Sequence, residues 1–190
     1  IGDVPRNRIA RLYPDGSLDT NFNPNANSFI ASIVLQPEGK ILIGGCFTTI
    51  GGVSRNHIAR LNPDGTLDTA FNPDAESLVA SIVLQPDGKI LLGGSFATVA
   101  GLNRRGIARL NADGSVDTGF DPGTGASDDV LAVGLQPDGK ILLGGAFTSV
   151  GNASRPYLVR LEPAGSPDNS FIGTTGPDAL VRSIAVLSDG

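Results

Sequence analysis

The sequence predicts an all-β repeat protein, and three observations lead to this fold class. First, a block ending in Arg-Leu recurs, with its arginines at positions 11, 60, 109 and 160, which are 49, 49 and 51 residues apart. Second, turn glycines recur at positions 16, 39, 65, 88, 114, 139, 165 and 190, in Pro-Asp-Gly or close variants. Third, the segments beside these turns are short and aliphatic, for example Ser81–Leu84. Such segments are typical of strands and are too short for helices.

The Pro-Asp-Gly triplets predict the turns of β-hairpins. Proline fixes φ at the first turn position, aspartate accepts hydrogen bonds from nearby backbone N–H groups, and glycine adopts the positive φ that other residues avoid. Two such turns occur in each long repeat, so each repeat is expected to contain two related hairpins.

Four strands in a repeat of about 50 residues are typical of one blade of a β-propeller. The Gly-Gly pairs at 44–45, 93–94 and 144–145 predict crowded packing between strands. We therefore predict one propeller fragment over residues 1–190, with about four four-stranded antiparallel blades. The expected repeat units are 1–49, 50–98, 99–149 and 150–190, the last one incomplete. A β-solenoid or a wrapped ribbon of hairpins is the alternative.

The number of blades predicts a larger ring. Closed propellers usually have four to eight blades, and a shorter array on its own would expose an apolar sheet face. Further blades of the same chain, or a partner subunit, are therefore expected to cover it.

Composition argues against several partners. The net charge is −5 and the pI is about 4.7, so nucleic acid and anionic membranes would be repelled on average. No apolar run is long enough to predict membrane insertion. The single cysteine, Cys46, excludes an internal disulfide and aligns with Ser95 and Ala146, which indicates a small residue in a tight space.

No catalytic or cofactor-binding residue is predicted, and we expect a protein that is not an enzyme. The one histidine, His57, aligns with Arg8, Gly106 and Tyr157, as expected for a loop position. Nucleophile-elbow, phosphate-loop and dinucleotide motifs do not occur. The single aspartate of each turn lacks the alternating carboxylates of a calcium loop. Asp128 and Asp129, the only paired acidic site, are weak candidates for metal binding.

A recurring set of charged residues is expected to support the fold. These residues are Arg11, Arg60, Arg109 and Arg160, and Asp19, Asp68, Asp117 and Asp168. Each arginine is expected to reach a carboxylate or loop carbonyls in its own or the adjacent blade, and each aspartate to cap a turn. The alternative is a ring of ligand-binding carboxylates.

Two stretches of the sequence resemble a known family. The run 58–69, Ile-Ala-Arg-Leu-Asn-Pro-Asp-Gly-Thr-Leu-Asp-Thr, and the run 84–96, Leu-Gln-Pro-Asp-Gly-Lys-Ile-Leu-Leu-Gly-Gly-Ser-Phe, resemble the delta-sixty repeat family. That family is described as a β-propeller domain of unknown function in large secreted or surface proteins of bacteria. The resemblance implies a fold and an extracellular, cell-surface or periplasmic location, but no activity. The fourth repeat departs from the pattern at Ala164 and Pro167.

The turns and the longer links are expected on opposite faces. In an antiparallel blade alternate connections lie on opposite faces, so all Pro-Asp-Gly turns should share one of them. The other face should carry the links 23–28, 72–77, 121–129, 172–179 and 48–56 with its equivalents. Because these links vary, and variable loops on a rigid scaffold carry binding specificity, we expect binding there.

The function expected from these observations is a non-catalytic binding, adhesion or scaffold module. It would act in an extracellular or cell-surface bacterial protein and recognise a protein or a glycan through the long-loop face. Two alternatives remain at this stage. One is a propeller enzyme of the hydrolase or lyase type whose axial active site uses further blades. The other is an accessory subunit packed on a larger assembly.

Overall fold

The computed structural model describes residues 3–171 and 176–189, which form three three-stranded antiparallel sheets and three two-stranded hairpins. The first contains β1 (Ile30–Leu35), β2 (Ile41–Gly45) and β5 (Ile58–Leu61). The second contains β6 (Val79–Leu84), β7 (Ile90–Gly94) and β10 (Ile107–Leu110), and the third β11 (Val130–Leu135), β12 (Ile141–Gly145) and β15 (Leu158–Leu161). We name these sheets blades 1, 2 and 3. The described residues contain no helix, and hence none that could cross a membrane.

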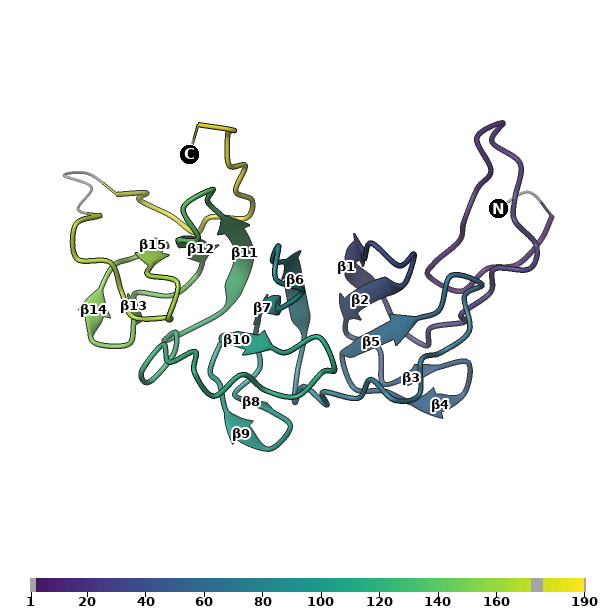
Figure 1. Cartoon of the computed structure of the whole chain (residues 1–190), viewed down its shortest axis with the longest axis horizontal. Helices are drawn as coiled ribbons and strands as arrows, with labels where there is room; N and C mark the ends of the chain where they lie inside the picture. Colours follow the sequence, from purple (N-terminus) through teal and green to yellow (C-terminus); the bar gives the residue numbers. More distant parts are fainter. Residues whose placement is uncertain (1–2, 172–175, 190) are drawn as a thin grey trace.

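The blades follow one another along an arc, with β1, β6 and β11 on its inner side (Figure 1). β6 contacts β1 on one side and β11 on the other. The sheets are therefore arranged radially, as the propeller prediction requires. Each blade crosses the boundary between two predicted repeat units, because β1 and β2 come before residue 50 and β5 comes after it.

A short hairpin at the outer rim of each blade connects the second and third strands (Figure 1). In blade 1 it consists of β3 (Thr49–Ile50) and β4 (Val53–Ser54). Blades 2 and 3 repeat it with β8 (Thr98–Val99) and β9 (Leu102–Asn103), and with β13 (Ser149–Val150) and β14 (Ala153–Ser154). An isolated bridge ties each hairpin to the chain that enters its blade, such as Ala26 to Ile50.

The fourth strand predicted for each blade is shorter than expected. It is reduced to one bridge pair, Leu61 with Leu67 in blade 1, and Leu110 with Val116 and Leu161 with Pro167 in the other two. The chain turns away directly afterwards because the carboxylate of Asp68 accepts a hydrogen bond from the backbone N–H of Ala70. The described blades are thus three-stranded sheets with a one-residue fourth strand.

The Gly-Gly pairs lie where neighbouring strands pack closely, as predicted. A Cβ atom on Gly93 would lie 2.7 Å from Val133 of blade 3, and one on Gly94 would collide with the carbonyl oxygen of Leu78. Between the blades the core is aliphatic and aromatic. Its largest fully buried side chains are Phe22, Phe47, Phe71, Phe96, Phe120 and Phe147.

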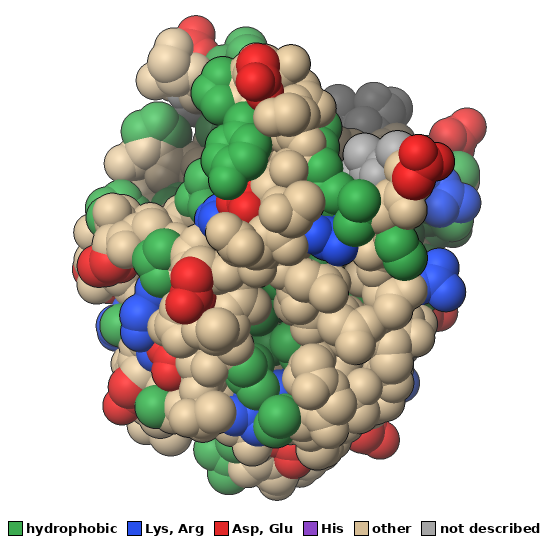
Figure 2. Space-filling view, turned by 90° about the vertical axis from the view of Figure 1, so that its right-hand side faces the viewer, with side chains coloured by type: hydrophobic (Ala, Val, Ile, Leu, Met, Phe, Trp, Pro, Cys, Tyr) green, Lys and Arg blue, Asp and Glu red, His purple; other side chains and the backbone are tan. Residues whose placement is uncertain are grey.

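Segments at both ends of the chain continue the repeat. Leu12 and Leu18 form the same bridge as Leu61 and Leu67, so residues 9–22 correspond to the outer part of a further blade. Residues 181–186 pack on blade 3, where a Cβ on Gly144 would lie 2.6 Å from Val181. Figure 2 views the molecule from the N-terminal side of the arc, where hydrophobic side chains are visible between scattered charged ones.

Candidate functional site

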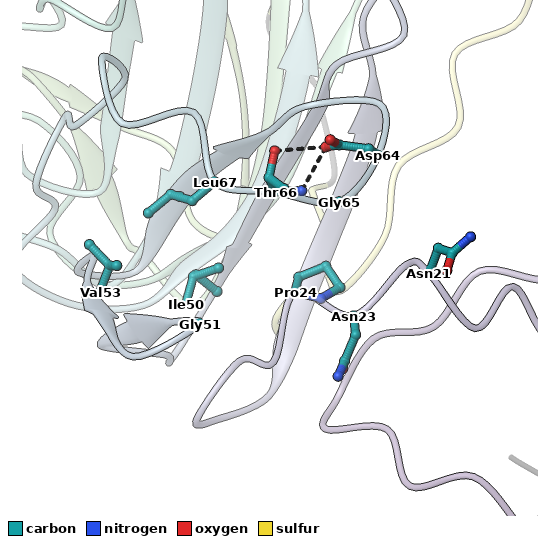
Figure 3. A pocket seen from close by; sticks show the side chains of 10 residues that line it. All are labelled: Asn21, Asn23, Pro24, Ile50, Gly51, Val53, Asp64, Gly65, Thr66 and Leu67. Atoms are coloured by element: carbon teal, nitrogen blue, oxygen red, sulfur yellow. Dashed lines mark hydrogen bonds between the residues drawn. The ribbon is translucent and has the colours of Figure 1, made fainter.

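A concave site recurs at the outer rim of the arc, and we name it the rim groove. In blade 1 it has a volume of about 280 Å³ and three walls (Figure 3). The walls are the loop 21–24, the tip of the β3–β4 hairpin at 50–53, and the turn at 64–67. The groove therefore joins two of the variable links to one Pro-Asp-Gly turn. The prediction that the turns and the links lie on opposite faces is therefore wrong at this site, where residues of both line one groove.

Backbone geometry fixes the turn wall of the blade 1 groove. Gly65 has a φ of +90°, and a Cβ atom there would lie 2.7 Å from the ring of Phe22. Asp64 Oδ1 accepts hydrogen bonds from the backbone N–H of Thr66 at 2.9 Å and from its hydroxyl at 2.7 Å. These two hydrogen bonds lower the pKa of the Asp64 carboxyl below its usual value, with the hydroxyl making the largest contribution. The groove therefore carries a negative charge at neutral pH.

The lining of the blade 1 groove is apolar at its base and polar at its edge. Ile50, Leu67 and Pro24 supply the apolar base, and Val53, 45% exposed, extends it outward. The polar edge is formed by Asn21, Asn23, Asp64 and Thr66. Such a lining suits a ligand that places an apolar side chain on the base of the groove and offers hydrogen-bond donors, from its backbone or its adjacent side chains, to the polar edge.

Blade 3 repeats the groove with different side chains. Its walls are residues 121–123, 151–153 and the turn region 166–169, and its volume is about 570 Å³. Ala153 stands where blade 1 has Val53, and Pro167 stands where it has Leu67. Asp121, Asn152 and Asn169 make this lining more polar. The same backbone frame thus presents two different surfaces.

The weak metal candidates line a separate polar pocket on the long-loop side, with a volume of about 250 Å³. Asp128 accepts a hydrogen bond from the backbone N–H of Asp129 at 2.8 Å. Arg105 lines the same pocket and donates to the carbonyl of Ser127 at 3.3 Å. A cationic side chain in the pocket disfavours the binding of a metal cation. No group of three or more metal-binding side chains is found in residues 3–171 and 176–189.

The recurring arginines and aspartates lie close together in every blade, and we name them the arginine–aspartate ladder. In each pair the arginine Nε donates to Oδ2 of the aspartate eight residues later, at 2.8–2.9 Å. The guanidinium also lies 4.4–4.8 Å from the centre of a phenylalanine ring, a cation–π geometry. The ladder pairs are Arg11–Asp19, Arg60–Asp68, Arg109–Asp117 and Arg160–Asp168.

The ladder also links neighbouring blades. Arg60 donates through Nη1 to the carbonyl oxygen of Ala112 in blade 2 at 2.7 Å, and Arg109 donates in the same way to Pro163 in blade 3 at 2.6 Å. Arg11 makes the equivalent contact with Pro63. Each of these three arginines therefore binds a carboxylate of its own blade and a turn carbonyl of the next.

A lysine completes three of the ladder pairs. Lys40, Lys89 and Lys140 bind Asp68, Asp117 and Asp168 at 2.7–2.8 Å. The hydrogen bond from Lys89, followed by that from Arg109, lowers the pKa of the Asp117 carboxyl to about 2. With two cations on one aspartate Oδ2 and a backbone N–H on Oδ1, these carboxylates are occupied within the fold.

His57 and Cys46 lie in the link between the second and third strands of blade 1. His57 has a φ of 63°, and its Nδ1 lies 3.3 Å from the carbonyl oxygen of Gly45. Cys46 is a free, partly exposed thiol. The predicted link 172–179 begins with residues 172–175, which lie outside the described part of the chain.

The radial arrangement of repeated antiparallel sheets defines the class of this protein as a β-propeller. A family model described as a domain of unknown function (DUF5122) beta-propeller matches residues 1–22, 36–71, 85–120 and 136–171, which is more than half of the chain. The chain belongs to this family. A comparison with curated proteins finds no match.

A solved structure supports the same fold. The chain is similar to the crystal structure of the WD40 beta propeller domain of Doa1, with a TM-score of 0.62 and 19% sequence identity. The match covers 93% of this chain and 50% of that chain, so the present chain spans about half the length of that propeller.

Proposed function

We propose that the chain is a non-catalytic binding module that docks segments of a protein partner in its rim grooves. The observation that carries the proposal is the recurrence of one groove frame in blades 1 and 3 with different linings. A fixed frame with variable side chains is the arrangement by which repeat scaffolds present binding surfaces.

A protein segment suits the blade 1 groove better than a glycan. Sugar rings commonly stack on aromatic side chains, whereas the apolar part of this lining is aliphatic. Asp64 and the net charge of −5 favour a segment in which an apolar residue is followed or preceded by Lys or Arg. A location outside the cell or at the cell surface, part of the same proposal, is supported by the resemblance to the delta-sixty repeat.

The chemistry of the groove supports binding over catalysis. Asp64 is the one titratable side chain among the residues that line the blade 1 groove, and Thr66 already binds its carboxylate. A nucleophile or general base within reach of a second functional group is the usual sign of an active site.

A selection from a phage-displayed peptide library against the immobilised chain tests this function. Enriched peptides are expected to pair an apolar residue with Lys or Arg. The double variant Val53→Lys/Ala153→Lys should weaken their binding at least about tenfold, or ~1.4 kcal/mol, because it places a positive charge beside the apolar base of each groove and repels the basic residue of the peptide. Ala112→Lys, an exposed change in a turn outside the two grooves, is the matched control and should bind normally.

Three results would contradict the proposal. They are the absence of enriched peptides, peptides that bind the double variant as well as the original chain, and binding to a glycan array without binding to peptides.

A further inference from the structure

The polar pocket on the long-loop side lies in the middle of the arc, where the link of blade 2 meets the chain that enters blade 3. It has a volume of about 250 Å³ and is lined by residues 94–96, 105–106 and 127–129. We name it the link pocket. Its charged side chains are Arg105, Asp128 and Asp129. It is therefore a small site that carries charges of both signs.

The charges of the link pocket depart from the repeat. Every other repeat has uncharged residues at these positions, namely Asn7, Asn56 and Pro156 for Arg105, and Ser28–Phe29, Ser77–Leu78 and Ala179–Leu180 for Asp128–Asp129. The same blade frame forms in blade 1 without these charges. The fold does not require them, so they are free to serve a ligand.

The side chain of Arg105 lacks the partner that this repeat position has in blade 1. There Asn56 Nδ2 donates to Asp74 Oδ1 at 2.8 Å. The position of Asp74 is taken by Gly125 in the next repeat, which has no side chain to accept from Arg105. Among the described residues the guanidinium group keeps one contact, from Nη2 to the carbonyl oxygen of Ser127 at 3.3 Å. Most of its donors remain available.

The two carboxylates of the link pocket are not neutralised by the arginine. Asp128 Oδ1 accepts a hydrogen bond from the backbone N–H of Asp129 at 2.8 Å. None of the ion pairs formed within residues 3–171 and 176–189 involves either aspartate or Arg105. An anion alone would leave the carboxylates unpaired, and a cation alone would leave the guanidinium unpaired. The complementary ligand therefore carries both charges.

A glycine keeps the link pocket open. Gly106 has a φ of 73°, in the same left-handed region as His57 and Tyr157 at this repeat position. In blade 1, His57 Nδ1 lies 3.3 Å from the carbonyl oxygen of Gly45, which corresponds to Gly94 of the pocket. Blade 1 thus has an imidazole beside the strand end that is left accessible in blade 2.

We propose that the link pocket binds a free α-amino acid in its zwitterionic form. The ligand carboxylate accepts hydrogen bonds from the planar guanidinium group of Arg105, and the ligand ammonium group donates to the carboxylates of Asp128 and Asp129. The small volume and the polar lining favour a short side chain, for which the hydroxyl of Ser95 is available. The N-terminus of a peptide is a poorer complement, because its carbonyl oxygen brings no negative charge to Arg105.

An NMR titration tests this proposal. The isotope-labelled chain is titrated with glycine, L-alanine and L-serine, and its backbone amide signals are followed. At least one of these amino acids should shift the signals of Ser95, Gly106 and Asp129 to saturation, with millimolar affinity or tighter. N-acetylglycine lacks the ammonium group and glycinamide lacks the carboxylate, so neither should do so. Glycinamide also represents the N-terminus of a peptide.

Two variants test the assigned contacts with side chains that the fold already accepts at these repeat positions. Arg105→Asn introduces the residue found at Asn56, and Asp129→Leu the residue found at Leu78. Each should weaken amino-acid binding at least about tenfold and leave the amide signals of blade 1 unchanged. Arg8→Gln, which removes an exposed arginine in the link of the first repeat, is the matched control and should bind normally.

The proposal would be overturned if none of the three amino acids shifted these signals, or if N-acetylglycine or glycinamide shifted them equally. Undiminished binding by both pocket variants would also overturn it. None of these results bears on peptide binding in the rim grooves, because the link pocket shares no lining residue with the grooves of blades 1 and 3.

Discussion

The arginine–aspartate ladder and the rim grooves are built by the same repeat, but they differ in how strictly they are repeated. The ladder keeps its Nε-to-Oδ2 distance within 2.8–2.9 Å in all four pairs. The groove doubles in volume from about 280 to about 570 Å³ between blades 1 and 3. The ladder lies between blades and each change there affects two of them, whereas the groove faces solvent and can change alone. Blade cohesion and the proposed recognition thus depend on different parts of one unit.

The strongest test of this contrast removes one ladder carboxylate. Asp117→Asn should lower the free energy of unfolding by about 2–3 kcal/mol, because Arg109, with a side chain only 11% exposed, and Lys89 lose their shared anion. Urea unfolding followed by circular dichroism measures the change. Asp113→Asn, in the exposed turn of the same blade, is the control and should have a much smaller effect. Equal effects of the two changes would remove the distinction between ladder and surface.

Acid titration tests the same group without a mutation. The pKa of Asp117 in the folded chain is about 2, below its usual value of 3.8. The contribution of this carboxylate to stability is therefore complete above pH 3.8 and is lost as the pH falls toward 2. Between pH 5 and pH 3 this carboxylate alone should account for about 1 kcal/mol of lost stability. Urea midpoints across this range should fall less steeply for Asp117→Asn than for the original chain. Identical slopes would mean that Asp117 does not contribute.

The smallest effect on stability is expected for a substitution in the rim groove. Val53→Ser, at a 45% exposed position, should change the free energy of unfolding by less than about 0.5 kcal/mol. The same variant should still weaken the binding of peptides selected on the original chain. A destabilisation as large as that of Asp117→Asn would show that the hairpin tip supports the blade and is not free to vary.

The repeat and its turn chemistry made most of the fold predictable from the sequence. Gly39 and Gly65, for example, have φ values of 78° and 90°, as the turn triplets predicted. The two turns of blade 1 also share one face, since a Cβ on Gly39 would lie 3.4 Å from Pro63. These features depend on residues within one or two repeats, which the sequence displays directly.

The shortened fourth strand and the rim groove were not predicted. The fourth strand ends at Leu67 because Asp68 uses its backbone and carboxylate to bind Arg60 and to turn the chain, which the pattern of apolar residues does not reveal. The β3–β4 hairpin was taken as part of a link, although Gly51-Gly52 at its tip is a turn signal. The groove itself requires three segments from two repeats to meet, and this depends on how the blades pack.

The hydrogen bonds from Arg11, Arg60 and Arg109 to the turn of the following blade have a consequence for how such arrays can lengthen. Duplication of a whole repeat copies both the donor and the acceptor, so the new neighbour arrives with its contact already complete. An insertion or deletion of one or two residues within a turn would displace an acceptor such as the carbonyl of Ala112 from its arginine. Arrays of this kind should therefore grow during evolution by whole units, while small insertions accumulate in segments such as 121–129, which lie away from that contact.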